Sequence, residues 1–308
     1  MSQASIQPQT PDPISVRITT DDGYQLAGSE YRPATAESNG KAGIAAAPGH
    51  GIGVVINGAT GVLRQYYDGF ARFLCHQGFT VLTYDFRGIG GSLQHAPGAP
   101  VPTMLHWGQR DMDAALSFFM ERHPQLLVKG IGHSIGGQLL GVLPDNNRYH
   151  GFLNIASQHI YWKNWPLRDR ALTAAFFFGV LPLFYKSVGG LPKWVLGAEY
   201  LPKQVARDWS RFGRNKAYIA DEQGQPLRQG FSGYRGRMRF YAMADDRRFA
   251  PPACVRELEK LFSNADTEVR VLHPRDFDMK AIDHFGFFKK SMHQRAWQES
   301  ADWLAQPA

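Results

Sequence analysis

Short apolar segments of strand length alternate with amphipathic helical segments along most of this 308-residue chain. A strand, a helix and a second strand in succession favour a crossover unit, because two parallel strands can be joined only through such a connection. The repeated alternation therefore predicts a doubly wound, mostly parallel sheet. Strands are expected at 14–20, 25–32, 54–57, 79–84, 126–131, 151–156, 238–243 and 268–273, and helices at 66–77, 107–122, 252–262, from 137 onwards and at the C-terminus.

Two parts of the chain depart from this alternation. Asp22-Gly23 lies between the first two strands and is a strong hairpin signal, which predicts an antiparallel edge to an eight-stranded sheet. The alternation stops after residue 156 and resumes at 238, so we expect an α/β core over 14–156 and 238–308. Residues 157–237 would form an inserted cap with helices of its own. The polar, proline-containing residues 1–13 are expected to form a disordered tail.

The segment Gly132-His133-Ser134-Ile135-Gly136 has the pattern G-x-S-x-G and falls where a buried strand is followed by a helix. At such a junction a serine can occupy a sharp, strained turn that presents its hydroxyl, an arrangement called a nucleophile elbow. The turn requires small residues two positions before and after the serine, and Gly132 and Gly136 meet this requirement. The pattern also occurs in ordinary glycine-rich turns, so its position in the alternation is what makes Ser134 the candidate nucleophile.

A serine hydroxyl needs a base within hydrogen-bond reach and a carboxylate behind that base. Where the serine lies on a nucleophile elbow, the chain order is serine, acid, histidine. Three histidines, His273, His284 and His293, follow the late strand. His284 is the candidate base because it lies in a loop between the last strand and the final helix. His273 ends a strand and His293 falls in the predicted helix, where structural or surface roles are more common.

The acid is expected just after the strand 238–243, where Asp245 and Asp246 are adjacent. Like charges side by side disfavour joint ionisation, so one of the two carboxylates is expected to bond a neighbouring arginine or a backbone amide instead. Asp246 is the first choice because it begins the turn that precedes Pro251. Asp245 remains the alternative.

Acyl transfer also requires N–H donors for the oxyanion that develops on the attacked carbonyl. One is expected from the residue after the nucleophile, Ile135, and the other from the loop that follows an earlier strand. Asn57-Gly58-Ala59-Thr60-Gly61 follows the buried strand 54–57, which nominates the amide of Ala59, with Thr60 in reserve. Asn57-Gly58 is also ordinary turn chemistry.

Together, the elbow, the segment Asp85-Phe86-Arg87-Gly88-Ile89-Gly90-Gly91-Ser92, the Asp245-Asp246 pair and His284-Phe285-Gly286 resemble the α/β-hydrolase superfamily over most of residues 14–305. Gly58-Ala59-Thr60-Gly61 and Tyr66-Tyr67 are most similar to a bacterial group of predicted hydrolases related to the serine aminopeptidase and lysophospholipase branch. The resemblance implies the α/β-hydrolase fold, and it implies that the Asp85–Ser92 turn mainly shapes the sheet edge. Asn57 departs from the more common histidine.

These residues predict a serine hydrolase that cleaves an ester, thioester or small amide through an acyl-enzyme. Two alternatives remain. The same triad supports acyl transfer to an alcohol or amine, and a catalytically silent protein of this fold could serve as a binding module. A small-molecule acyl substrate is the expected partner. No metal or organic cofactor is expected. Nucleic-acid binding is not expected either, because no binding motif accompanies the basic residues. No pattern indicates the oligomeric state.

The predicted cap concentrates the positive charge of the chain. It holds thirteen Lys and Arg against five Asp and Glu, while the whole chain has a net charge of +7. Four of the seven tryptophans, Trp162, Trp165, Trp194 and Trp209, also fall there. Two interpretations stay open. In the first, the aromatic residues form the walls of an acyl pocket and the cations attract an anionic head group or a membrane surface. In the second, the cap has an apolar underside and a solvated basic top.

Two further features bear on the compartment. The apolar stretch 171–185 contains Pro182 and is shorter than the roughly 20 residues that span a bilayer, so only peripheral membrane contact is compatible with it. Cys75 and Cys254 lie far apart in helical patterns, which is typical of reduced core thiols. We therefore expect a cytoplasmic protein.

Overall fold

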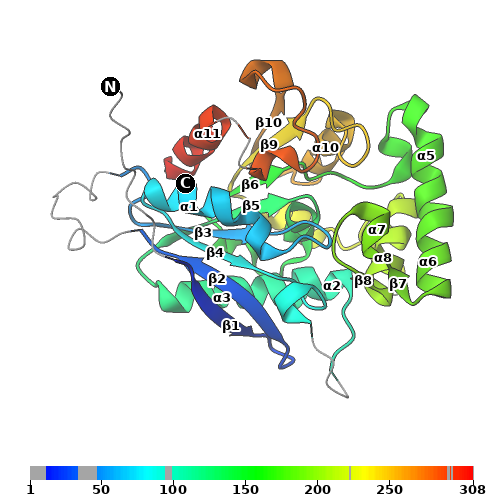
Figure 1. Cartoon of the computed structure of the whole chain (residues 1–308), viewed down its shortest axis with the longest axis horizontal. Helices are drawn as coiled ribbons and strands as arrows, with labels where there is room; N and C mark the ends of the chain where they lie inside the picture. The colour runs from blue at the N-terminus through cyan, green and yellow to red at the C-terminus, as the bar shows by residue number, and fades with distance from the viewer. Residues whose placement is uncertain are drawn as a thin grey trace.

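An eight-stranded sheet runs through the centre of the computed structural model (Figure 1). The structure describes residues 12–33, 47–93, 99–221, 223–289, 292 and 294–307, so most of the expected tail and His293 lie outside it. The strand order is β1-β2-β4-β3-β5-β6-β9-β10. Among the described strands of this sheet, only the β1–β2 and β2–β4 pairs are antiparallel, which confirms a mostly parallel sheet with an antiparallel edge. The strands are β1 Ile14–Thr19, β2 Gln25–Tyr31, β3 Ile52–Asn57, β4 Thr80–Tyr84, β5 Leu127–His133, β6 Gly151–Ile155, β9 Arg237–Met243 and β10 Asp266–Leu272.

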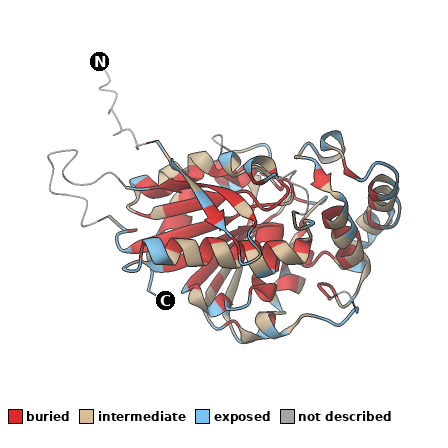
Figure 2. Ribbon diagram, turned by 90° about the horizontal axis from the view of Figure 1, so that it is seen from below, coloured by how far each residue is buried: buried red, intermediate tan, exposed pale blue. Residues whose placement is uncertain are grey.

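Helices enclose the buried strands (Figure 2). On α1, the side chains of Phe70, Ala71 and Leu74 are buried at helical spacing, which explains why the amphipathic pattern predicted this helix. Cys75 and Cys254 are buried and free. The helices of the core are α1 Asp68–His76, α2 Met104–His106, α3 Met112–Arg122, α4 Ile135–Gln138, α10 Pro252–Glu259 and α11 Gln294–Ala305.

The helix after the elbow differs from the prediction. It begins at Ile135 rather than 137, has only four residues, and gives way to a 3-10 turn at Leu139–Val142. Gly136 and Gly137 explain its shortness, because glycine in a helix is less favourable than alanine by about 1 kcal/mol per residue.

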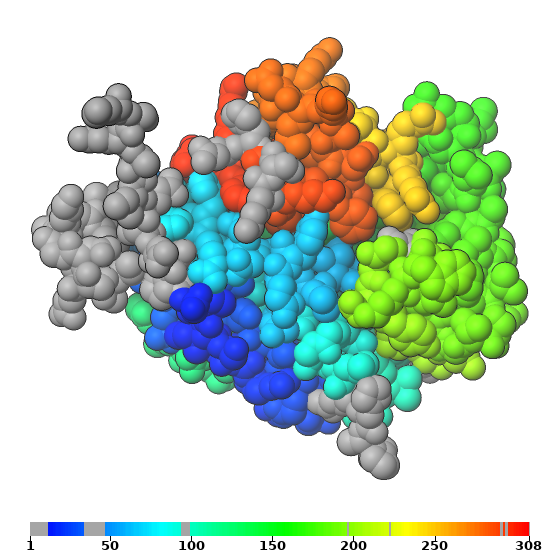
Figure 3. Space-filling view, in the orientation of Figure 1, coloured from blue at the N-terminus to red at the C-terminus, as the bar shows by residue number. Residues whose placement is uncertain are grey.

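Between β6 and β9 the chain forms a helical layer at one end of the molecule (Figure 1). A π-helical turn at Phe176–Val180 joins α5 to α6, and these helices border the green end of the space-filling view (Figure 3). The bounds 157–237 of the cap stay a prediction. The elements of this layer are α5 Arg170–Ala175, α6 Leu181–Ser187, β7 Gly190–Leu191, α7 Lys193–Leu196, β8 Leu201–Pro202, α8 Lys203–Arg214 and α9 Gln229–Gly233.

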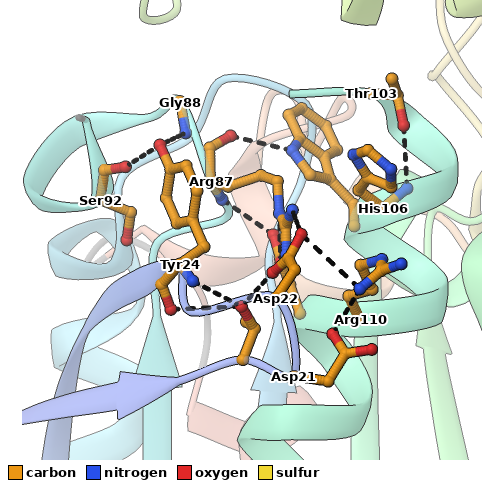
Figure 4. A network of polar contacts seen from close by, with 12 residues as sticks. Asp21, Asp22, Tyr24, Arg87, Gly88, Ser92, Thr103, His106 and Arg110 are labelled. Atoms are coloured by element: carbon orange, nitrogen blue, oxygen red, sulfur yellow. Dashed lines mark hydrogen bonds and ion pairs between the residues drawn. The ribbon is translucent and has the colours of Figure 1, made fainter. Parts of the chain in front are cut away.

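Arg87 ties the hairpin turn to the helical segment that begins at α2 (Figure 4). Its fully buried guanidinium bonds Asp111 at 2.6 Å and Asp22 at 2.8 Å, and its own backbone N–H donates to Asp111. The ring of Tyr24 lies 4.9 Å from the guanidinium carbon. These contacts join three segments distant in sequence and leave neither charge of the Arg87–Asp111 pair unpartnered.

Replacing Arg87 by methionine is expected to lower the free energy of unfolding by about 3–5 kcal/mol, because it leaves Asp111 buried without its partner. Arg110→Gln is the matched control. Arg110 is only partly buried, pairs with the exposed Asp21 and lies 3.7 Å from Asp22, and exposed pairs contribute about 0–1 kcal/mol each. Urea denaturation would measure the free energy of unfolding of both variants, compared at equal dependence of that free energy on urea concentration. Similar losses in the two would contradict the assigned role of the buried pair.

Candidate active site

Ser134 lies at the junction of β5 and α4 in a strained backbone conformation. Its φ is 53° and its ψ is −114°, and its N–H donates to the carbonyl of Ile155 on the neighbouring strand at 2.9 Å. A non-glycine residue persists in this region only when its surroundings impose it, and such strain gathers at functional sites. A nucleophile elbow has this strained geometry, and the role of Ser134 as nucleophile stays a prediction.

The two glycines of the motif allow close approaches that any side chain would prevent. A Cβ on Gly132 would lie 2.4 Å from the Cα of Gly137, and a Cβ on Gly136 would lie 2.1 Å from the carbonyl oxygen of Asn57. The start of α4 therefore packs directly on the loop after β3. This contact brings together the two segments that were predicted to supply the oxyanion donors.

His284 pairs with Asp246. Nδ1 of the imidazole lies 2.6 Å from Oδ2 of the carboxylate, and both side chains are buried. Burial alone would raise the pKa of Asp246, but the His284 ring and the N–H groups of Phe249 and Ala250 outweigh it, so the pKa is lowered. An ionised acid behind Nδ1 favours the tautomer in which Nε2 is free to accept a proton. His273 instead lies between the end of β10 and the 3-10 turn Pro274–Phe277.

Asp245 contacts the histidine loop in a different way. Its Oδ2 accepts the backbone N–H groups of Ile282 at 2.8 Å and Asp283 at 3.1 Å. The two adjacent carboxylates thus divide between two tasks, as the like-charge argument predicted. Asp246 bonds the imidazole, and Asp245 bonds the backbone immediately before it.

Sequence reasoning missed a buried hydrogen-bonded bridge from Tyr67 to His133. The hydroxyl of Tyr67 lies 3.0 Å from Nδ1 of His133, and Nε2 of His133 lies 3.0 Å from the carbonyl oxygen of His284. A carbonyl only accepts, so Nε2 carries the proton and Nδ1 accepts from the tyrosine. Burial, with His284 nearby, lowers the pKa of His133 to about 3, which keeps the ring neutral. This Tyr67–His133 bridge holds the His284 backbone against the elbow.

The same bridge bears on which N–H groups can serve as oxyanion donors. The N–H of Ala59 donates to the Tyr67 hydroxyl at 2.8 Å, so it is already bonded. The N–H of Thr60, the reserve candidate, donates to no protein acceptor within the described residues, which favours Thr60 over Ala59. Ile135 begins α4, where the first N–H groups have no helical acceptor, and it stays the other predicted donor.

A cavity of about 560 Å³ lies near the His284–Asp246 pair, although neither Ser134 nor His284 is among the residues that line it. The Phe249 ring forms part of its wall and lies 5.0 Å from the His284 ring, centroid to centroid. Gln158, also in the wall, accepts a hydrogen bond from Gln138 of α4. The rest of the lining comes mainly from the helical layer and consists of Ile160, Trp165, Asp169, Leu172, Thr173, Ala175, Phe176, Phe177, Val180, Trp209, Arg247 and Arg248.

Tyr67→Phe tests the positioning role of the bridge. Without the hydroxyl, His133 loses its donor and the His284 backbone loses part of its support, so we expect kcat to fall by up to about 10²-fold with KM little changed. Tyr234→Phe is the control, because it removes another buried hydroxyl, which bonds the carbonyl of Tyr149. Steady-state kinetics on an aryl ester would measure both, and equal kcat in the two variants would exclude the role.

Residues 48–156 match the model of a family described as serine aminopeptidase, S33. No curated protein sequence matches the chain. None of the helices in the described residues is both long and apolar enough to cross a bilayer.

Solved structures similar to this chain include enzymes that act on esters. A soluble variant of the monoglyceride lipase of Saccharomyces cerevisiae superposes with a TM-score of 0.65 at 14% identity, over 99% of this chain and 98% of that one. The Pyrococcus furiosus esterase Pf2001 gives 0.60 at 15%, over 97% and 94%. DcsB, in complex with a substrate analogue, gives 0.64 at 11%, over 96% and 100%. At these identities the likeness establishes the fold.

Proposed function

Since this chain has the α/β-hydrolase fold, we propose that it is a serine hydrolase that cleaves carboxylic esters, with Ser134 as nucleophile, His284 as general base and Asp246 as the orienting acid. The observation that carries the proposal is the 2.6 Å contact between His284 and Asp246 on a loop bonded to the residue before Ser134. Thioesters and small amides are further substrates for the same chemistry.

The reaction follows from the roles of these groups. Ser134 Oγ attacks the acyl carbonyl while Nε2 of His284 takes its proton, and Asp246 stabilises the imidazolium that forms. The oxyanion receives the N–H of Ile135 and, in our assignment, that of Thr60. The tetrahedral intermediate collapses to the acyl-enzyme, and the alcohol leaves with the proton from His284. Water then attacks the acyl group by the reverse proton path and releases the acid.

The cavity beside Phe249 is the candidate acyl pocket. Its volume of about 560 Å³ is within the usual range for small-molecule sites, roughly 300–1,000 Å³. Trp165, Phe177 and Trp209 in its wall are almost fully buried, so an acyl chain placed there would leave water for an aromatic surface.

The proposal predicts that p-nitrophenyl butyrate and hexanoate are turned over with higher kcat/KM than the acetate. Each added methylene contributes at most about 0.8 kcal/mol, or roughly fourfold, until the pocket is full. A series from acetate to decanoate measures the profile with one leaving group throughout. A flat profile would exclude the cavity as the acyl pocket, and the absence of any turnover would refute the proposed function.

A further inference from the structure

Positive charge gathers where the aromatic cavity meets the loop that carries Asp246. Arg247 and Arg248 line the cavity, and Asp169 lies opposite them on the helical layer. Asp169 bonds Arg247 at 2.7 Å and also lies 3.4 Å from Nε of Arg168. Asp169 thus faces two guanidinium groups and does not contact Arg248. The lining holds two arginines against this one carboxylate, which leaves a net positive charge at the edge of an otherwise apolar cavity.

Arg248 is the arginine whose charge is not compensated. No carboxylate partner is recorded for it within the parts of the chain that the structure describes, whereas Arg247 is engaged by Asp169. Its guanidinium carbon lies 5.2 Å from the centroid of the Phe249 ring, and its side chain is exposed. The group is therefore free to bond a ligand without breaking an internal ion pair.

The position of Arg248 relates its charge to the reaction centre. The centroid of the Phe249 ring lies 5.2 Å from the Arg248 guanidinium carbon and 5.0 Å from the centroid of the His284 ring. The guanidinium therefore lies at most about 10 Å from the base. An ester bound at Ser134 with its chain along Phe249 would bring a substituent a few bonds from the carbonyl to this cation.

From this arrangement we infer that the preferred substrates are esters that carry an anionic group, a carboxylate or a phosphate, which Arg248 binds while the hydrocarbon part occupies the cavity. This inference rests on the proposed function. A guanidinium suits either anion because its planar N–H groups can donate to two oxygens at once. The anion would stay at the exposed edge of the cavity, where it keeps part of its hydration and avoids the cost of full burial.

The test compares matched anionic and neutral esters on the same enzyme. Mono-p-nitrophenyl adipate is compared with p-nitrophenyl hexanoate, which has a chain of equal length without the terminal carboxylate. In a second arm, 1-hexanoylglycerol 3-phosphate is compared with 1-hexanoylglycerol, so that a phosphate on the alcohol side is distinguished from a carboxylate on the acyl side. The readout is the ratio of kcat/KM for the anionic ester to that for its neutral counterpart.

Arg248→Gln is expected to lower this ratio by about five- to tenfold in at least one arm, as the loss of one charged hydrogen-bonded contact at an exposed site would. Arg248→Lys should retain part of the ratio, and added salt should lower it in the wild type but not in Arg248→Gln. Arg256→Gln removes one exposed arginine from α10 and should leave the ratio unchanged.

An unchanged ratio in Arg248→Gln in both arms, with the neutral esters still turned over, would overturn this inference and leave the proposed function standing. If the neutral esters are not turned over in a Ser134-dependent way, both proposals fail. A fall of the ratio in the adipate arm alone would assign the anion to the acyl side, and a fall in the glycerol phosphate arm alone to the alcohol side.

Discussion

Replacing Ser134 by alanine is expected to lower kcat for an activated aryl ester by about 10⁴- to 10⁶-fold, because the members of a catalytic triad act as a unit and the loss of one removes the acyl-enzyme route. The free energy of unfolding should change by about 1 kcal/mol or less, since alanine only omits a hydroxyl. Steady-state kinetics together with thermal unfolding would separate loss of chemistry from loss of fold.

Histidine variants provide the matched controls. His284→Ala should abolish acylation in the same way, whereas His273→Ala should not, because His273 lies at the start of the 3-10 turn Pro274–Phe277 and outside the contacts around Ser134. Retained turnover in Ser134→Ala would show that Ser134 is not the nucleophile. Equal losses in the two histidine variants would leave the base unassigned.

The second large effect is expected from Asp246→Asn, with a loss of kcat of about 10⁴-fold. The asparagine amide can donate to Nδ1 of His284, so it favours the tautomer in which Nε2 is protonated and cannot accept the serine proton. It also removes the charge that stabilises the imidazolium. KM should change far less, because neither effect acts on the bound ground state.

Asp245→Asn is the control for this substitution, because it alters the adjacent carboxylate without changing the contact to the imidazole. One asparagine oxygen can still accept from the backbone N–H groups of Ile282 and Asp283, so a loss well under 10²-fold is expected. Circular dichroism would verify that both variants are folded. A larger loss in Asp245→Asn than in Asp246→Asn would reverse the assignment of the acid.

Much of the fold could be predicted because the core strands are short apolar segments between turn residues. β4 and β6 illustrate this, since each is buried along nearly its whole length and was expected within one residue of its bounds. β5 was expected to end at Ile131 but continues to His133. Gly132 and a polar histidine interrupt the apolar pattern there, yet the neighbouring strand supplies hydrogen-bond partners up to the elbow.

The candidate site was predictable where local pattern determines position and not where distant residues meet. Ser134 and His284 follow from their places after a strand and in a loop. The bond from Ala59 to the Tyr67 hydroxyl and the attachment of Asp245 to residues 282–283 depend on tertiary contacts that no local pattern contains. Two residues of the sequence could have suggested the bridge: His133, at the first x position of G-x-S-x-G, and Tyr67, which follows the oxyanion loop.

The helical layer bears on both interpretations of the predicted cap. Phe177 and Trp209 line the cavity, as the acyl-pocket interpretation expected. Outside the cavity, α6 exposes Leu183, and Phe178 of the turn between α5 and α6 lies under the guanidinium of Arg214. Peripheral contact with a membrane through this side stays a prediction, as does the cytoplasmic location.

The central claim is that Ser134 is an activated nucleophile, and covalent labelling tests it most directly. The purified chain would be treated with a fluorophosphonate, and the modified residue would be identified by intact mass and peptide mapping. We expect one adduct per chain, on Ser134, that is absent in Ser134→Ala and forms far more slowly in His284→Ala. An unlabelled chain, or an adduct on another residue that persists in Ser134→Ala, would contradict this claim.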